Sequence, residues 1–333
     1  MRMSRRLGIY GGKKKTVKYK GAAALGNTMY NPATAKIGDY AIFVGINSAS
    51  AVNRSLTVTE LPSSINADQG KGASLPSYAV FLSGWKNTIA SGIAYDSSLT
   101  AKSNFFVNYS YRYGGVAVIG NYAIWVGGIN SSGSVVHDTT CCDNSLTSQS
   151  ISDLDQDSPQ YNMAYGTTNY YGTENAVFFG SGTLDIYDSS LSYSHTTLQS
   201  GVNDPWMIVT YTSVNFNGNI ICPDLVTCSL LSISGYGTVA VLPATGIEMC
   251  EYIASAEIED QSIVFAGALD SNDVYAYDKS FTQSIIDSLS QSRIAPGAIS
   301  IGNVALFGGG CSTYSDLDNG GTAYNTIDAY EFS

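Results

Sequence analysis

The chain has 333 residues, of which 44% are hydrophobic, 11% aromatic and only 13% charged. This composition excludes general disorder, because a chain so rich in apolar residues can bury a large core. Residues 1–20 hold eight Lys and Arg and no acid, whereas the remaining eight bases and 27 acids give the rest a net charge of −19. Such an acidic body repels phosphate backbones, so we expect no nucleic-acid partner.

Residues 1–15 predict a basic N-terminal arm rather than a targeting segment. The apolar residues 7–10 are interrupted by glycine and followed by three lysines, so the hydrophobic core of a signal peptide is missing. We therefore expect no secretion signal, no membrane insertion and assembly in a cytoplasm. We expect six cations of the arm to contact an acidic protein surface. They are Arg2, Arg5, Arg6, Lys13, Lys14 and Lys15.

One pattern recurs along the chain: a turn residue, four or five apolar residues rich in β-branched and aromatic types, and then usually glycine. Copies begin near residues 38, 77, 120, 175, 217, 261 and 302. Each copy reads as a buried β-strand. Their spacing of roughly 40 to 55 residues is typical of the four-stranded blades of a β-propeller. Seven copies predict seven blades, and six remain possible because the copy near residue 217 lacks the glycine.

A second element follows most copies: an apolar strand ending in Tyr, then Asp, Ser and the start of a new strand. Asp96, Asp188 and Asp278 begin the clearest examples, and residues 143–147 form a weaker one. An Asp side chain can accept hydrogen bonds from backbone N–H groups two residues on, so each example predicts a hairpin between outer strands. The tyrosines that precede these turns, and Tyr330 near the end of the chain, are expected to fill the strands.

These residues resemble the kelch-type repeat, which has four apolar residues, a Gly-Gly and a Tyr near the end of the third strand. The resemblance covers the chain from about Gly38 onward, and Leu99, Leu191 and Phe281 stand where kelch repeats usually have Trp. It implies an all-β, seven-bladed kelch-like β-propeller formed by residues 16–333 as a single domain. The last blade ends after its third strand, so we expect residues 16–25 to supply the fourth and close the ring.

The sequence contains few residues of the types on which catalytic sites of propeller enzymes depend. The only two histidines, His137 beside a predicted turn at 138–140 and His195, fall in strand regions rather than in loops of the central mouth. Copper oxidases that share the kelch propeller use a site with two His, and sialidase-type propellers need three Arg. Arg112 and Arg293 precede the first strands of two blades, which predicts packing, and there is no nucleophile elbow. We expect no enzyme and no catalytic residues.

Two acidic loops carry oxygen ligands at alternate positions, as calcium loops do. One contains Asp153, Asp155 and Asp157, and the other, which also bears a glycine, offers Asp316, Asp318 and Asn319 as the calcium candidates. A solvated loop is the alternative for each, and no other cofactor is expected. The six cysteines have spacings that suit neither a zinc ribbon nor a redox CxxC site, so we expect reduced thiols.

Tyrosine runs between blade strands are candidates for a ligand-binding surface, because Tyr buries apolar area and keeps a polar tip. The alternative is that these tyrosines fill strands. The candidates are Tyr109, Tyr111, Tyr113, Tyr170 and Tyr171.

Similar kelch-like propellers are encoded among tail genes of phages that infect Gram-positive bacteria. The resemblance implies a non-enzymatic binding or structural component of a bacteriophage virion, in the tail, baseplate or neck. The arm would dock onto other virion subunits or another acidic protein, and the propeller would recognise a host surface glycan or a neighbouring subunit. The alternative is a bacterial glycan- or protein-binding kelch adaptor with no virion role.

Overall fold

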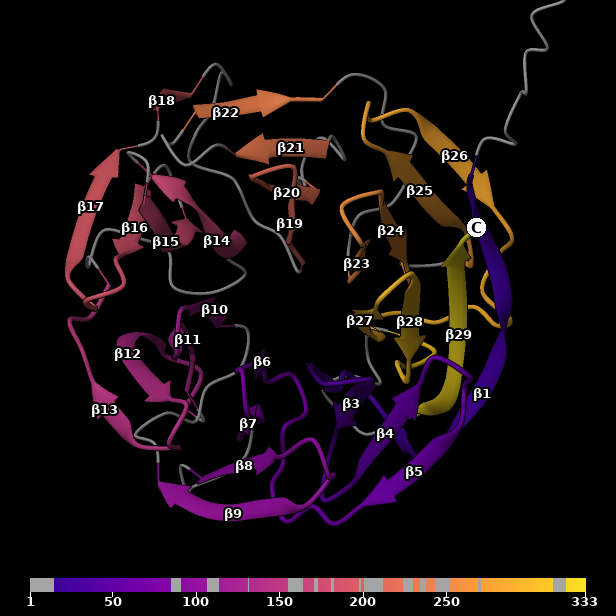
Figure 1. Ribbon diagram of the computed structural model, residues 1–333, viewed down its shortest axis with the longest axis horizontal. Helices are drawn as coiled ribbons and strands as arrows, with labels where there is room; N and C mark the ends of the chain where they lie inside the picture. Colours follow the sequence, from indigo (N-terminus) through magenta and orange to yellow (C-terminus); the bar gives the residue numbers. More distant parts are fainter. Residues whose placement is uncertain are drawn as a thin grey trace, which may run out of the picture.

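A computed structural model shows seven small antiparallel sheets that follow one another around a central axis (Figure 1). This confirms the all-β, seven-bladed propeller. Among the described residues no helix is long and apolar enough to cross a membrane. The structure describes residues 15–84, 91–106, 114–130, 132–154, 164–170, 173–180, 183–197, 199–200, 212–223, 230–233, 238–242, 252–268, 271–313 and 322–333.

In each blade the first strand lies nearest the axis and the last strand lies at the rim (Figure 1). Blade 1 consists of β2 (Ala33–Ile37), β3 (Tyr40–Val44), β4 (Ala49–Asn53) and β5 (Val58–Leu61). Blade 2 consists of β6 (Gly72–Ser74), β7 (Ala79–Leu82), β8 (Ser91–Tyr95) and β9 (Ala101–Phe106). Blade 3 consists of β10 (Gly115–Ile119), β11 (Tyr122–Ile129), β12 (Val135–Asp143) and β13 (Ser148–Ser150). Blade 4 consists of β14 (Ala164–Tyr170), β15 (Thr173–Gly180), β16 (Thr183–Tyr187) and β17 (Tyr193–Thr197).

The remaining blades include one with an additional strand and one built from both ends of the chain. Blade 5 consists of β19 (Val214–Phe216), β20 (Asn219–Pro223), β21 (Leu230–Ile233) and β22 (Thr238–Val241), with β18 (Gln199–Ser200) added in parallel to β22. Blade 6 consists of β23 (Ala254–Ile258), β24 (Ser262–Ala266), β25 (Val274–Asp278) and β26 (Gln283–Ile286). Blade 7 consists of β27 (Gly297–Ile301), β28 (Val304–Gly308), β29 (Tyr324–Phe332) and β1 (Val17–Met29). The irregular copy near residue 217 therefore forms a full blade, and six blades are excluded.

The predicted aspartate turns are confirmed. Asp96 Oδ1 accepts the N–H groups of Ser98 and Thr100 at 2.9 and 3.0 Å, and Asp143, Asp188 and Asp278 accept equivalent pairs. Leu99, which lies between Ser98 and Thr100 in this turn, has a φ of 61°. Leu or Phe takes this left-handed conformation at the same turn position in four other blades. They are Leu56, Leu146, Leu191 and Phe281.

These left-handed residues contact the neighbouring blade. A left-handed non-glycine residue costs roughly 1–2 kcal/mol. Each of the five side chains packs onto the hydrophobic cluster between its own blade and the preceding one, as Leu99 does beside Tyr95. Burial of an apolar side chain offsets a cost of this size. Leu or Phe at this turn position thus serves as a contact between blades.

The tyrosines that precede the turns are buried, as predicted. Phe81 and Tyr95 meet edge to face, with ring centroids 6.1 Å apart. The same pair forms in blades 4, 6 and 7, where a Phe of the second strand contacts the Tyr of the third. Tyr95 also donates to the carbonyl of Pro62, which follows the rim strand of blade 1. The aromatic repeat of the sequence therefore joins each of these blades internally and, through Tyr95, joins one blade to its neighbour.

The N-terminal strand closes the ring, which confirms the predicted closure. β1 pairs with β29 in antiparallel fashion, from Val17 opposite Phe332 to Met29 opposite Tyr324. Thr16 and Ser333 exchange backbone hydrogen bonds of 3.0 and 3.1 Å. β1 continues four residues beyond the predicted limit of residue 25, because its last residues pair with the start of β29.

A buried ion pair lies beside this closure. The guanidinium of Arg293 donates to Asp328 at 2.7 Å, and both side chains are fully buried. The other carboxylate oxygen of Asp328 accepts the hydroxyl of Tyr19 on β1 at 3.0 Å. Burial, followed by the charge of Asp328, raises the pKa of Tyr19 to about 12, so the phenol keeps its proton at neutral pH. The packing role predicted for Arg293 is confirmed.

Removal of residues 1–25 should destabilise the entire ring, because blade 7 would lose most of its fourth strand and expose the edge of β29. We expect the melting temperature to fall by about 10 °C or more, as a loss of several kcal/mol does in a chain of this size. Removal of residues 1–15 alone serves as the control and should leave it unchanged. Equal melting of the two truncated proteins by differential scanning calorimetry would refute closure by β1.

Arg293→Met should destabilise the protein by about 3–5 kcal/mol, because it leaves Asp328 buried without its cation. Arg54→Met is the matched control. Arg54 lies 3.9 Å from Asp39 in an exposed pair, and such pairs contribute about 0–1 kcal/mol. The free energy of unfolding of both variants is measured by urea denaturation. Similar losses in both would show that the buried pair is no more important than a surface contact.

Candidate functional site

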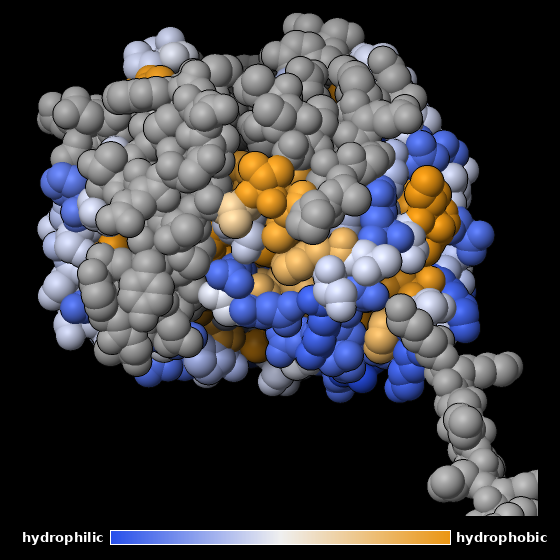
Figure 2. Space-filling view, turned by 90° about the horizontal axis from the view of Figure 1, so that it is seen from above, coloured by the Kyte–Doolittle hydropathy of each residue, from blue (hydrophilic) through white to orange (hydrophobic). Residues whose placement is uncertain are grey.

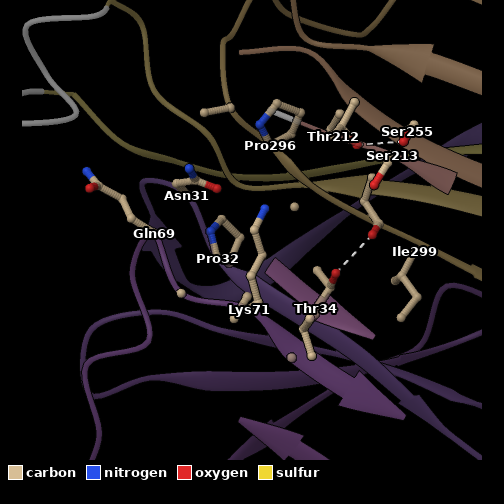
Figure 3. Close-up of a pocket in the computed structure, with 18 of the residues that line it drawn as sticks. Asn31, Pro32, Thr34, Gln69, Lys71, Thr212, Ser213, Ser255, Pro296 and Ile299 are labelled. Carbon is tan, nitrogen blue, oxygen red and sulfur yellow. Dashed lines mark hydrogen bonds between the residues drawn. The ribbon is translucent and has the colours of Figure 1, made fainter. Parts of the chain in front are cut away.

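A cavity of about 380 Å³ lies at the centre of the ring, at the end where the chain enters the first strand of each blade. Its described lining comes from six blades, at the beginnings of β2, β6, β10, β19, β23 and β27. It belongs to no single blade, because each of the six contributes residues to it. Figure 3 shows side chains from these different strands around it.

Small residues at the beginnings of the first strands let the blades meet here. A Cβ on Gly72 would lie 2.6 Å from the carbonyl oxygen of Thr34, and a Cβ on Gly297 would lie 2.8 Å from that of Pro32. Both distances are too short for any side chain. At these two points the cavity wall is closely packed backbone.

The first strands alternate between residues that face the core and residues that face the channel. In β2, Ala33, Ala35 and Ile37 are buried between blades, whereas Thr34 is half-buried and Lys36 is exposed. Because strand side chains alternate in direction, Thr34 and Lys36 lie on the opposite face of β2, and Thr34 also lines the cavity. Residues 213–216 show the same alternation of burial.

Hydrogen bonds between polar residues join neighbouring first strands around the cavity (Figure 3). Thr34 donates to the carbonyl of Ala298 at 2.9 Å. The hydroxyls of Thr212 and Ser255 lie 2.5 Å apart. These bonds cross from blade 1 to blade 7 and from blade 5 to blade 6, so they hold the lining in one arrangement.

Lys71 is the one charged side chain in the described lining. Asn31 and Gln69 contribute amides to the same lining, and Pro32 and Pro296 contribute apolar wall (Figure 3). Such a lining can donate and accept hydrogen bonds and attract one negative charge. Within the described lining there is no pair of carboxylates and no histidine, so it offers no general acid and base pair.

Both histidines lie outside this lining, as predicted. His195 is exposed on β17, the rim strand of blade 4, and His137 lies on β12, the third strand of blade 3. The predicted turn at 138–140 is wrong. Those residues lie inside β12, where Thr139 and Thr140 pair with Val126 and Trp125, and the chain turns later, after Asp143.

Most residues singled out in the sequence lie outside the described residues, and their roles stay predictions. Lys15 is exposed immediately before β1. Tyr170 is the last residue of β14, and its backbone pairs with Thr173 at the β14–β15 hairpin. The others outside the description are Arg2, Arg5, Arg6, Lys13, Lys14, Tyr109, Tyr111, Tyr113, Tyr171, Asp316, Asp318, Asn319 and Arg112.

The described residues contain no group of three or more His, Cys, Asp or Glu that could hold a metal ion. Asp153 instead accepts the N–H of Thr139 at 2.9 Å. The four cysteines described, at positions 141, 142, 222 and 311, are free and buried, in agreement with the predicted thiols. Burial raises the pKa of Cys142 to about 12, which leaves it protonated and unsuited to act as a nucleophile at neutral pH.

The cavity residues were not predicted from the sequence. A usable signal was present in the alternation of small apolar and polar residues at 33–36 and 254–257, which is typical of a strand with one wet face. Lys71 gave no such signal, because it stands before a three-residue strand in a loop that resembles other polar loops of the chain.

No protein-family model matches this sequence, and no curated protein matches it. Solved structures do resemble it. One is a catalytically inactive histidine-to-alanine variant of virginiamycin B lyase from Staphylococcus aureus with quinupristin, at 11% identity and a TM-score of 0.63, covering 96% of this chain and 100% of that one. A second is a streptogramin B lyase, at 10% identity and a TM-score of 0.64, covering 96% of this chain and 98% of that one. At such low identity the likeness establishes a shared propeller fold and nothing finer.

Proposed function

We propose that this protein is a non-enzymatic binding and structural module of a bacteriophage virion, in the tail, baseplate or neck. The propeller recognises a ligand, and the basic N-terminal arm docks it onto an acidic subunit. The observation that carries the binding role is the central cavity, whose described lining is polar and holds one charged side chain, Lys71. The virion setting rests on the kelch-like repeats and on the separation of a basic arm from an acidic body.

The lyases of similar fold do not lead us to propose streptogramin cleavage. Loss of one histidine accompanies inactivity in the S. aureus variant. This chain has two histidines, and His137 and His195 both lie outside the cavity lining. A shared fold does not imply a shared reaction, since function depends on the site.

The rim of blades 6 and 7 supports docking through the arm. Lys15 and Lys18 are exposed where the chain enters β1, so the arm is attached at the outer edge of blade 7. On the neighbouring rim strand, β26, Ile285 is 73% exposed. Figure 2 views the ring from the side of blades 5 and 6 and shows hydrophobic residues among hydrophilic ones there. An apolar contact beside a group of cations suits an acidic protein partner.

Removal of residues 1–15 should abolish recovery of virion proteins in a pull-down from the source lysate, followed by mass spectrometry, because it removes the six cations. The fold should persist, since Thr16 and β1 remain. A variant with the six cations replaced by Gln is the matched control for arm length and should behave like the truncated protein.

Recovery of the same tail, baseplate or neck proteins without the arm would refute docking by its charges. Recovery by the intact protein of carbohydrate alone would favour the adaptor with no virion role.

A further inference from the structure

We infer that the central cavity binds a small hydroxylated molecule carrying one anionic group, of the class of acidic monosaccharides, and that Lys71 contacts the anion. This inference rests on the proposed binding function and names the ligand class of the same site. The volume of about 380 Å³ falls within the range of small-molecule pockets. It is lined by residues at the beginnings of first strands from six blades, which suits a small ligand better than a protein segment.

The lining is suited to a ligand with many hydroxyl groups. Thr34, Ser213 and Ser255 contribute hydroxyls, and Asn31 and Gln69 contribute amides, from four different blades (Figure 3). Each of these groups can both donate and accept a hydrogen bond, as a sugar hydroxyl can. A sugar can add hydrogen bonds to these groups beyond those they make within the protein, whereas a purely apolar ligand can add none.

Apolar residues lie between these polar groups, and such a mixture is a second property of a sugar-binding site. Pro32, Pro296 and Ile299 line it beside the polar side chains (Figure 3). The carbon-bound hydrogens of a sugar ring form an apolar face that can pack on such residues. Polar groups that converge beside apolar residues are typical of preformed ligand sites.

Lys71 selects for a negative charge. It is the one charged side chain in the described lining, in a chain whose acids outnumber its bases by 27 to 16. An ammonium group binds carboxylate or phosphate oxygens through charge-assisted hydrogen bonds. A cationic ligand would meet repulsion from it, so the lining favours an anion.

The backbone at Lys71 is held in place before any ligand arrives. The indole N–H of Trp125, a fully buried residue of blade 3, donates to the carbonyl of Lys71 at 3.1 Å. On the following residue, Gly72, the contact with Thr34 excludes a side chain. The ammonium therefore extends from a fixed base, which lowers the entropy lost on binding.

Isothermal titration calorimetry of the full chain with glucuronate tests this inference, with glucose as the matched neutral probe. We expect one glucuronate per chain, with a dissociation constant in the millimolar range or tighter, and clearly weaker binding of glucose. Lys71→Gln should weaken glucuronate binding by about tenfold or more, because it removes a charge-assisted hydrogen bond. Lys102→Gln, which removes an exposed lysine from the rim strand β9, should leave it unchanged.

A second variant tests whether the cavity itself is the site. Asn215 is exposed and lines the cavity, so Asn215→Phe should fill the space without disturbing the core and should abolish binding of both probes. Equal melting temperatures of all variants would show that each folds.

The inference is overturned if glucuronate does not bind, if glucose binds equally well, or if Lys71→Gln and Asn215→Phe bind as the parent does. Loss of arm-dependent docking would instead count against the proposed function. Conversion of glucuronate by the intact protein would refute its non-enzymatic nature while leaving the cavity as the site.

Discussion

Closure of the ring by the two ends of the chain is the constraint on which the rest of the structure depends. Every blade buries both faces against its neighbours, so a ring with one incomplete blade would expose a sheet edge and two hydrophobic clusters. β1 completes blade 7 by pairing along β29. At the same place Tyr19, Arg293 and Asp328, from three segments far apart in sequence, meet through buried polar contacts. A buried ion pair adds little net stability, but it disfavours any register of β1 and β29 that leaves its charges without partners.

Closure also determines where a ligand can bind. Six of the seven first strands that converge on the axis begin with Ala or Gly, and Gly72 and Gly297 lie too close to neighbouring carbonyls to carry a side chain. The strands cannot meet completely, so a cavity remains at the centre. Several residues that line this space are polar, such as Thr34, whereas its neighbours in β2, Ala33 and Ala35, are buried between blades. The cavity is thus a consequence of blade number and residue size, and its chemistry depends on a few side chains.

The sequence predicts features that repeat or that act over short distances. The blade count, the aspartate turns and the closing strand follow from periodic patterns and from turn chemistry within five residues, such as that of Asp96. The Arg293–Asp328 pair could not be predicted, because it joins residues 35 positions apart whose approach depends on the packing of blade 7. The cavity was missed for a related reason: six blades each contribute a few residues, so no contiguous motif marks it. In the sequence, Leu99, Leu191 and Phe281 stand out only because Trp is usual at their position in kelch repeats. The structure shows in addition that these left-handed turn residues face the preceding blade.

Likeness of fold and likeness of site are separable in this architecture. The core-facing residues of the first strands, such as Ala33 and Ala254, are constrained by packing on the next blade. Some of the residues between them are less buried, as the exposed Lys36 is, so they can change without loss of the ring. A propeller can therefore keep the TM-score of 0.63 seen with a lyase at 11% identity while its central lining changes completely. For this chain the relevant comparison is between linings, and a wall of hydroxyls and amides around Lys71 is suited to holding an anionic ligand rather than to moving protons within one.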